Sequence, residues 1–476
     1  MKNKSLSVTI IIYLICVIGF GTMAQEKHES IEISPDVTYQ TIEGFGFFGA
    51  HDVWWGDHEN LWNREWAEMV ITDLGISMWR NEIYPPSTPE RRQDADWNKQ
   101  LPVVEGFKSV ADEHGVDLRY ILTVWSPPAH MKWDARMGWA GDRDATRVPS
   151  EHVQTNRGGT LNPEMYREYA EYLITEVQSY VDKGIDVYAL SLQNEPAFSQ
   201  SFNSCQYTTY WYTELLNGVV PFIRKAFPRL LIFGSEHMLQ NEGRDVDWPH
   251  FYHNEIKNDP HAPDNIDVFA VHGYTDGVSA SHGSALVDYW TNHKEQFSGP
   301  LGKRAWMTET SGYSDEWLGD DKDPGALALA SDIQAGLLYG DMSAWVWWQG
   351  SESGGIGRYN LMKGVIPGKK YYASKHFYRF IRPGAVRIDV TANDPDMVIS
   401  GFKHQSNETV TIVIVNPADE GKSVLLSGNG LQGEFSVYLT TSGDFNCTLR
   451  GSVIVGSALD IPPQSVVTLQ SGGKPL

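Results

Sequence analysis

Apolar and polar positions follow two periodicities over most of this chain. Short apolar runs typical of buried strands alternate with segments such as 163–181, where apolar residues recur every three to four positions as on one face of a helix. Eight strands are predicted, over 44–48, 76–83, 117–125, 187–193, 230–235, 268–272, 305–309 and 344–348. Such alternation builds parallel sheets covered by helices, so we predict an α/β fold with a closed (β/α)8 TIM barrel over 44–382.

The pattern changes at 382–384, an Arg-Pro-Gly run. Beyond it, seven short strand-like runs are separated by turn-forming residues, as at 393–396 and 427–430. This pattern predicts an appended C-terminal β-sandwich over 383–476. Residues 25–43 also alternate in a strand-like way, and we expect them to join this β-domain from the other terminus.

Residues 1–24 have the features of a secretory signal peptide. Lys2 and Lys4 precede an apolar stretch, and small residues precede a cleavage position before Gln25. The apolar stretch is shorter than the roughly 20 residues of a membrane span. We therefore expect a secreted or periplasmic protein with no membrane attachment after cleavage. Cys205 and Cys447 are then the remaining cysteines, and the sequence does not show whether they pair.

Charge and aromatic content narrow the range of partners. A formal net charge of −22 repels phosphate backbones, which argues against a nucleic-acid partner. The chain has 17 Trp and 22 Tyr, whose rings pack cores but also stack on the apolar faces of sugars. No Cys/His spacing resembles a zinc site, and no glycine-rich phosphate loop follows the first strand. A neutral polysaccharide or oligosaccharide is the expected substrate class.

Two predicted strands end in a glutamate. Glu195 follows the fourth strand and precedes Pro196, which cannot continue a central strand, and Glu309 ends the seventh. Carboxyl groups at the same end of parallel strands face each other across a barrel mouth, as cleavage of a glycosidic bond requires. We expect Glu195 to be the general acid/base, which needs a raised pKa, and Glu309 to be the nucleophile. Alternatively, Glu195 caps the following helix and Glu309 is an ordinary strand-end acid.

Other side chains at predicted strand ends are expected to bind substrate at the same mouth. Asn194 is placed to donate to a sugar 2-hydroxyl, and Arg80 to orient a carboxylate or to form a structural ion pair. His272 either holds the charge of the nucleophile, hydrogen-bonds a sugar hydroxyl, or is a packed core histidine. The complete set of substrate-binding candidates is Asn194, Trp125, Arg80, His272, Tyr274, Trp348, Trp55 and Glu236.

Five runs, at 125–132, 193–196, 306–309, 345–348 and 380–384, resemble motifs of glycoside hydrolase family 30 and occur in that family's order. The resemblance implies a (β/α)8 barrel with a β-domain built from both termini. It also implies retaining hydrolysis, with Glu195 as acid/base and Glu309 as nucleophile, and no metal or organic cofactor.

Within that family, the runs at 345–348 and 380–389 look most like the xylanase branch. Glucuronate-dependent members carry an Arg- and Tyr-rich loop after the eighth strand; here Arg358 and Tyr359 are displaced and Glu352 would repel a carboxylate. We therefore expect an endo-β-1,4-xylanase-like enzyme without dependence on glucuronate. The alternatives are a β-1,6-glucanase, a β-1,6-galactanase, an exo-acting β-glycosidase, or a carbohydrate-binding protein that has lost catalysis.

Overall fold

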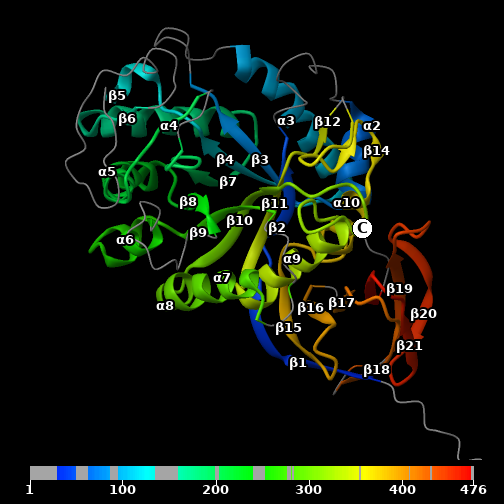
Figure 1. Ribbon diagram of the computed structural model, residues 1–476. Coiled ribbons are helices and arrows are strands. Elements are labelled where there is room, and N and C mark those ends of the chain that lie inside the picture. The colour runs from blue at the N-terminus through cyan, green and yellow to red at the C-terminus, as the bar shows by residue number, and fades with distance from the viewer. Residues whose placement is uncertain are drawn as a thin grey trace, which may run out of the picture.

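The computed structural model describes residues 29–49, 63–85, 95–133, 159–198, 203–239, 252–275, 280, 283–352, 355–406, 408–428, 431 and 433–472, and the side chains of all of these except 95–99 and 133. Within this part of the chain, two hydrogen-bonded sheets dominate the structure: a closed barrel and a nine-stranded sheet (Figure 1). Trp55 lies outside the described residues, as does the predicted signal peptide.

Eight parallel strands close the barrel, in the order β10-β11-β2-β3-β4-β7-β8-β9. They are β2 (Gly44–Phe48), β3 (Met78–Ile83), β4 (Arg119–Val124), β7 (Val187–Ser191), β8 (Leu231–Met238), β9 (Val268–Tyr274), β10 (Arg304–Ser311) and β11 (Met342–Trp348). Each coincides with one predicted strand, which confirms the barrel. At the β2–β3 contact only glycine fits at position 46, because a Cβ there would lie 1.7 Å from the carbonyl oxygen of Met78.

Helices cover the outside of the barrel. They are α2 (Arg64–Glu68), α3 (Ala95–His114), α4 (Tyr166–Val181), α5 (Thr209–Ala226), α6 (Tyr252–Asn258), α7 (Ala285–His293), α8 (Gly299–Leu301), α9 (Ala326–Tyr339) and α10 (Lys369–Tyr378), with π-helical turns at Met69–Leu74 and Lys294–Ser298. Short 3-10 turns occupy Ala129–Met131, Pro163–Met165 and Ala262–Asn265. Asn162 caps the turn that leads into α4 by accepting from the backbone N–H of Glu164, as the Asn-Pro pair predicts.

Two small sheets lie outside the barrel and the β-domain. One consists of β5 (Lys132–Trp133) and β6 (Thr160–Leu161), and the other of β12 (Ser351–Glu352), β13 (Met362–Lys363) and β14 (Ile366–Pro367). None of the helices in the described ranges is long and apolar enough to cross a bilayer.

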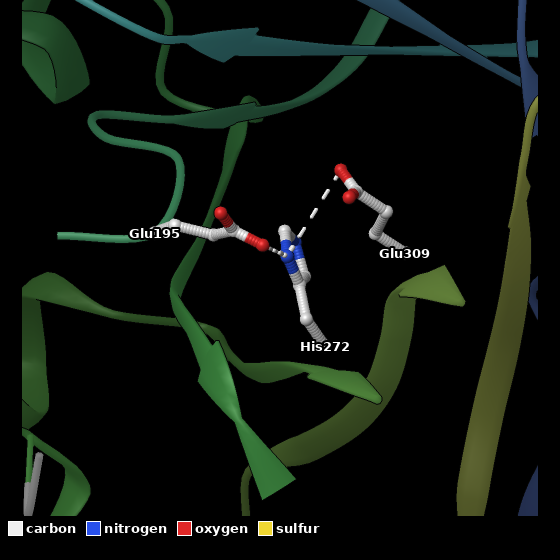
Figure 2. A group of neighbouring side chains, drawn as sticks. All are labelled: Glu195, His272 and Glu309. Carbon is white, nitrogen blue, oxygen red and sulfur yellow. Dashed lines mark hydrogen bonds and ion pairs between the residues drawn. The ribbon is translucent and has the colours of Figure 1, made fainter. Parts of the chain in front are cut away.

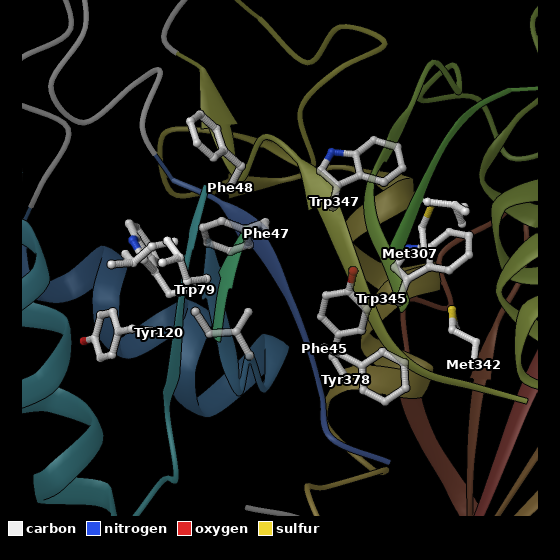
Figure 3. Packing of buried hydrophobic residues seen from close by; sticks show 14 of the residues in the cluster. Phe45, Phe47, Phe48, Trp79, Tyr120, Met307, Met342, Trp345, Trp347 and Tyr378 are labelled. Atoms are coloured by element: carbon white, nitrogen blue, oxygen red, sulfur yellow. The ribbon is translucent and has the colours of Figure 1, made fainter. Parts of the chain in front are cut away.

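Two apolar clusters stabilise the barrel. The smaller one fills its interior with residues such as Met78, Phe233 and Trp306. The larger one lies between the strands and the surrounding helices and is rich in aromatic rings, including Phe47, Trp79 and Trp345 (Figure 3). Because both faces of each strand are buried, most strand positions are apolar, and the buried polar residues of strands such as β3, β8 and β10 lie toward their carboxyl ends.

The β-domain is a nine-stranded, mostly antiparallel sheet in the order β20-β19-β22-β17-β16-β15-β1-β18-β21. Its strands are β1 (Glu29–Thr41), β15 (Ala385–Ala392), β16 (Val398–His404), β17 (Thr409–Asn416), β18 (Lys422–Gly428), β19 (Glu434–Thr440), β20 (Thr448–Ile454), β21 (Ala458–Ile461) and β22 (Ser465–Ser471). All nine are joined through hydrogen bonds, and their inward residues form one separate apolar cluster. β1 pairs antiparallel with β15 and parallel with β18, so both termini of the chain contribute to this sheet.

Helices α9 and α10 pack the β-domain against the barrel (Figure 1). Gln334 of α9 donates to the carbonyl of Val413 at 2.9 Å, and the buried ring of His376 in α10 lies 2.7 Å from the hydroxyls of both Thr440 and Thr468. Because β2 begins at Gly44 and β15 at Ala385, we propose 44–382 and 383–476 as the limits of the two domains, with 25–43 joining the second.

Candidate active site

The site lies at the carboxyl ends of the barrel strands, directly above the apolar interior. Side chains alternate along a strand, so the residues two positions beyond Met78, Ile121 and Ala270 face the same way. Those residues are Arg80, Thr123 and His272, all of them buried. A polar layer therefore rests on an apolar one.

Two β-bulges redirect side chains into this layer. In β8 the register against β9 shifts between Ser235 and His237, and in β10 it shifts between Met307 and Glu309. The extra residue in β8 is Glu236, whose φ of 60° lies in the left-handed region. The extra residue in β10 is Thr308, after which Glu309 pairs with His272. Bulges of this kind re-aim side chains next to functional sites.

Glu195 also has a left-handed backbone, with φ of 43°. It follows β7 in a tight turn in which the N–H of Phe198 donates to the carbonyl of Glu195 at 2.9 Å. Asn194 anchors the turn by donating its N–H to the carbonyl of Val124 at 2.7 Å. Non-glycine residues with this backbone cost energy and persist where the surrounding structure holds them, often at functional sites.

The turn and the bulges bring Glu195, His272 and Glu309 together (Figure 2). One carboxylate oxygen of each glutamate and a ring nitrogen of His272 lie within 4.8 Å of one another. Nδ1 of His272 is 3.0 Å from Oε1 of Glu195 and 3.9 Å from Oε2 of Glu309. The imidazole thus lies between the two carboxylates.

Arg80 and Tyr274 hold the carboxylate of Glu309. Nη1 of Arg80 donates to Oε2 at 2.6 Å, and the Tyr274 hydroxyl donates to Oε1. The same guanidinium donates to Oδ1 of Asn194 at 2.7 Å and to Oε1 of Glu236 at 2.9 Å. Burial lowers the pKa of Arg80, but the charges of Glu236 and Glu309 outweigh this effect and raise it, so Arg80 stays cationic.

His272 is held between acids on both sides of its ring. Its Nε2 is 3.3 Å from Oε1 of Glu236, opposite the contact with Glu195. Burial alone would lower the pKa of His272, but the charge of Glu309 and the hydrogen bonds with Glu195 and Glu236 raise it to about 9. The ring is therefore an imidazolium at neutral pH, with both nitrogens donating.

The environments of Glu195 and Glu236 push their pKa values in opposite directions. Burial raises the pKa of Glu195, the charge of Glu309 adds to the rise, and the hydrogen bond from His272 opposes it. Burial also acts on Glu236, but the charge of Arg80 and the interactions with His272 outweigh it and lower the pKa of Glu236. Glu195 therefore holds a proton more readily than an ordinary glutamate does, whereas Glu236 stays ionised.

An aromatic wall borders the acids. The rings of Phe48 and Trp348 stack with centroids 4.4 Å apart and planes inclined by 15°, and Trp125 lies 6.1 Å from Trp348. The guanidinium of Arg80 lies 4.9 Å from the centre of the Trp125 ring. Sugar rings stack on such surfaces.

The structure brings most of the predicted site residues together. Arg80, Asn194, Glu195, Glu236, His272, Tyr274 and Glu309 form one hydrogen-bonded network, with Trp125 and Trp348 beside it. Sequence reasoning missed Phe48 and Thr123. The signal for both was present, because Phe48 and Arg80 are register partners in β2 and β3, and Thr123 follows the interior residue Ile121 by two positions.

The grouping of Glu195, His272 and Glu309 also resembles a set of metal ligands by distance. A metal would need a lone pair on His272, but both of its ring nitrogens are hydrogen-bonded to carboxylates, Nδ1 to Glu195 and Nε2 to Glu236. The chemistry of these donors therefore fits an ion-pair network rather than a metal centre.

A (β/α)8 barrel with paired carboxylates and an aromatic wall at its mouth defines the class of barrel glycoside hydrolases. No protein-family profile matches the chain. Among curated proteins, the glucuronoxylanase XynC of Bacillus subtilis strain 168 is 28% identical over 483 residues, which cover 97% of each chain.

Solved structures show the same architecture. A family 30 endoxylanase from Clostridium papyrosolvens C71 matches with a TM-score of 0.71 at 22% identity, covering 93% of this chain and all of the other. The endo-β-1,6-glucanase BT3312 matches with a TM-score of 0.72 at 18% identity, covering 95% and 94%. The chain thus shares its fold with solved structures of glycoside hydrolase family 30 and is similar in sequence to a glucuronoxylanase over nearly its whole length.

Proposed function

We propose that this chain is a secreted, retaining endo-β-1,4-xylanase-like glycanase, with Glu195 as acid/base and Glu309 as nucleophile. The observation that carries the proposal is the approach of one oxygen of each carboxylate to within 4.8 Å. Retaining enzymes hold the two carboxyl groups about 5–5.5 Å apart, whereas inverting enzymes need roughly 6.5–9.5 Å to admit a water.

In the first step a carboxylate oxygen of Glu309 attacks the anomeric carbon, and the bond to the leaving oxygen breaks. Glu195 donates its proton to that oxygen, so the leaving chain departs as a neutral alcohol. Arg80 and Tyr274 donate to opposite oxygens of Glu309 and so fix the direction of attack. The raised pKa of Glu195 supplies the acid form that this step needs.

In the second step water attacks the glycosyl ester, and Glu195 accepts the proton of that water. Glu309 is uncharged while it is esterified, so one of the causes that raise the pKa of Glu195 is absent. The pKa of Glu195 falls accordingly, which suits its second role as a base.

Asn194 is proposed to bind the substrate 2-hydroxyl. Its amide oxygen accepts from Arg80, which orients the amide so that Nδ2 is the group presented to substrate. A hydrogen bond to the 2-hydroxyl strengthens as the transition state forms.

Xylan is the favoured substrate because the curated relative of nearly full length acts on glucuronoxylan, as its name states. Arg358 is engaged elsewhere, with Nε 2.8 Å from the carbonyl of Gly312 and 3.1 Å from Asp323. Glu352 adds negative charge after β11, where it accepts from Gln349. These contacts support xylan cleavage without a need for glucuronate. Hydrolysis of β-1,6-glucan is the second candidate, favoured by the match to the glucanase structure.

The test is a comparison of initial rates on xylan, glucuronoxylan, β-1,6-glucan and β-1,6-galactan, with sizing of the products. We expect the highest kcat/KM on xylan, equal rates with and without glucuronate, and products of mixed length. Proton NMR of early reaction mixtures should show the β-anomer first. Initial release of the α-anomer would refute double displacement, single-sugar release would indicate an exo enzyme, and binding without turnover would indicate a carbohydrate-binding protein.

A further inference from the structure

Helix α10 begins with two adjacent lysines that reach in opposite directions. Lys369 donates to the β-domain, where its Nζ is 2.7 Å from the carbonyl of Gly443, 3.2 Å from that of Thr441 and 2.8 Å from Oδ1 of Asn446. Lys370 points into the barrel and donates to the carbonyls of Tyr313, at 3.0 Å, and Gly357. One turn of helix therefore links the β-domain to two loops of the barrel.

The position of Lys370 is unfavourable for the helix itself. A cation in the first turn opposes the helix dipole, which favours acidic residues there. Lys370 is also fully buried, and burial lowers the pKa of its ammonium to about 8. A residue that breaks local preference at such a cost is expected to have a structural or functional role elsewhere.

The two carbonyls that accept from Lys370 belong to loops that leave the site. Tyr313 lies four residues after Glu309, beyond the end of β10, and Gly357 lies beyond the end of β11, which carries Trp348. Hydrogen bonds join these loops, from the N–H of Gly312 to the carbonyl of Arg358 at 2.9 Å and from Nε of Arg358 back to the carbonyl of Gly312 at 2.8 Å. Lys370 thus donates hydrogen bonds to both loops, close to the residues through which the loops bond to each other.

The start of α10 is fitted to this place. The backbone N–H of Lys370 lies 3.4 Å from Oδ1 of Asp315, in the loop after β10. A Cβ at Gly368 would lie 2.3 Å from the same oxygen, so any larger residue there would displace the Asp315 carboxylate from the start of α10. The Nζ of Lys370 is also 5.9 Å from the centre of the Trp347 ring. The ammonium is therefore held from several sides.

We propose that Lys370 is a positioning residue, which clamps the loops after β10 and β11 and so fixes Glu309 relative to the aromatic wall at Trp348. The inference rests on the proposed role of Glu309 as nucleophile. In this arrangement Lys369 binds the β-domain, and Lys370 holds the two loops of the barrel independently of that contact.

The direct test is hydrogen exchange on the full chain carrying Lys370→Met, with Lys369→Met as the matched control. Methionine keeps an unbranched apolar side chain and removes the donors. In Lys370→Met we expect the amides of Gly312 and Gln349 to exchange at least about tenfold faster, because the loops open more often. In Lys369→Met we expect faster exchange at 441–446 and little change at Gly312. Unchanged exchange at Gly312 in Lys370→Met overturns the clamp, whether or not the wild-type chain cleaves xylan.

Kinetics separate positioning from simple stabilisation. A displacement of about 1 Å at the reacting groups can cost about 100-fold in rate. We expect Lys370→Met to lower kcat at least tenfold on an aryl β-xyloside, with KM within about twofold, and to slow covalent trapping of Glu309 by a 2-fluoro xyloside to the same extent. Lys369→Met should change kcat less than about twofold.

A second variant guards against misfolding. Lys370→Gln keeps an N–H donor at a shorter reach, and we expect an intermediate kcat. If Lys370→Met does not fold, this variant carries the same kinetic test. An unchanged kcat in a folded variant with faster loop exchange overturns the positioning role. A wild-type chain with no glycosidase activity would instead refute the proposed function. The hydrogen-exchange result would then show by itself whether Lys370 holds the two loops.

Discussion

At the scale of single residues, three glutamates of the site lie in different electrostatic environments. Glu236 lies between two cations and is ionised, Glu195 is buried with a raised pKa, and Glu309 receives donors on both oxygens. The sequence predicted Glu195 and Glu309 as a facing pair because both end parallel strands. It did not predict which pKa would rise, because that depends on partners far away in the chain, such as Arg80 and His272.

Replacement of the proposed nucleophile should separate chemistry from folding. Glu309→Gln keeps the size of the side chain and an acceptor for Arg80 but cannot form the glycosyl ester. We expect kcat to fall by a factor on the order of 10⁴ or more. Calorimetry should show xylo-oligosaccharide binding within about threefold of wild type, and the circular dichroism spectrum should be unchanged. Turnover at more than about 1% of the wild-type rate would remove Glu309 from its proposed role.

The raised pKa of His272 predicts how stability depends on pH. The folded value is about 9 and the ordinary value about 6.5, so protonated His272 contributes stability that is complete below pH 6.5 and is lost as pH rises through 9. The contribution is at most about 3 kcal/mol, since each pKa unit corresponds to about 1.4 kcal/mol.

The measurement is urea unfolding of the wild-type chain and of His272→Gln from pH 6 to pH 10. We expect the difference in the free energy of unfolding to be largest near pH 6, to shrink as pH rises above about 6.5 and to be nearly gone by pH 10. A difference that stays constant with pH would show that folding does not shift the pKa of His272. Because the two chains are compared at each pH, the contributions of other titrating groups that both contain, such as Lys132, cancel in the difference.

At the scale of elements, strand positions were predictable and local distortions were not. All eight barrel strands coincide with predicted ones because fully buried strands are nearly continuous apolar runs between turn signals. The predicted end of β8 at 235 was too early, because the bulge at Glu236 lets the strand continue to Met238. A two-residue periodicity cannot reveal a bulge. Similarly, β21 was missed because it has only four residues, in which the alternation of Leu459 and Ile461 is too short to distinguish a strand from a loop.

The close contact between β2 and β3 gives an element-scale prediction. In Gly46→Ala the new Cβ would overlap the carbonyl of Met78, so the two strands must separate. We expect a loss of at least about 3 kcal/mol in the free energy of unfolding, measured with urea. Gly355→Ala is the matched control, because no atom lies within 4 Å of its Cβ, and it should change stability by less than about 0.5 kcal/mol. Equal stabilities of the two variants would show that β2 and β3 separate at no cost.

At the scale of the whole molecule, one sheet is built from both ends of the chain. The sequence predicted a strand before the barrel from its periodicity. It did not predict which strand pairs with it, because the partners lie more than 350 residues away, as Ile31 and Ala392 do. Cys205 and Cys447 are both buried and free, so no disulfide joins the two domains at these positions. Packing and hydrogen bonds through α9 and α10 link them instead.

This linkage predicts that the domains unfold together. Ile33 in β1 is buried in the β-domain core, far along the chain from the site, whereas Val37 of the same strand is 48% exposed. Ile33→Asp buries an unpaired carboxyl group, which should cost at least about 3 kcal/mol, and Val37→Asp should cost less than about 1 kcal/mol. If β1 supports the barrel through α9 and α10, Ile33→Asp must lower the midpoint temperature of xylanase inactivation as much as that of circular dichroism loss. Inactivation at the wild-type temperature, with early loss of β-domain signal alone, would mean that the barrel folds and works without its partner sheet.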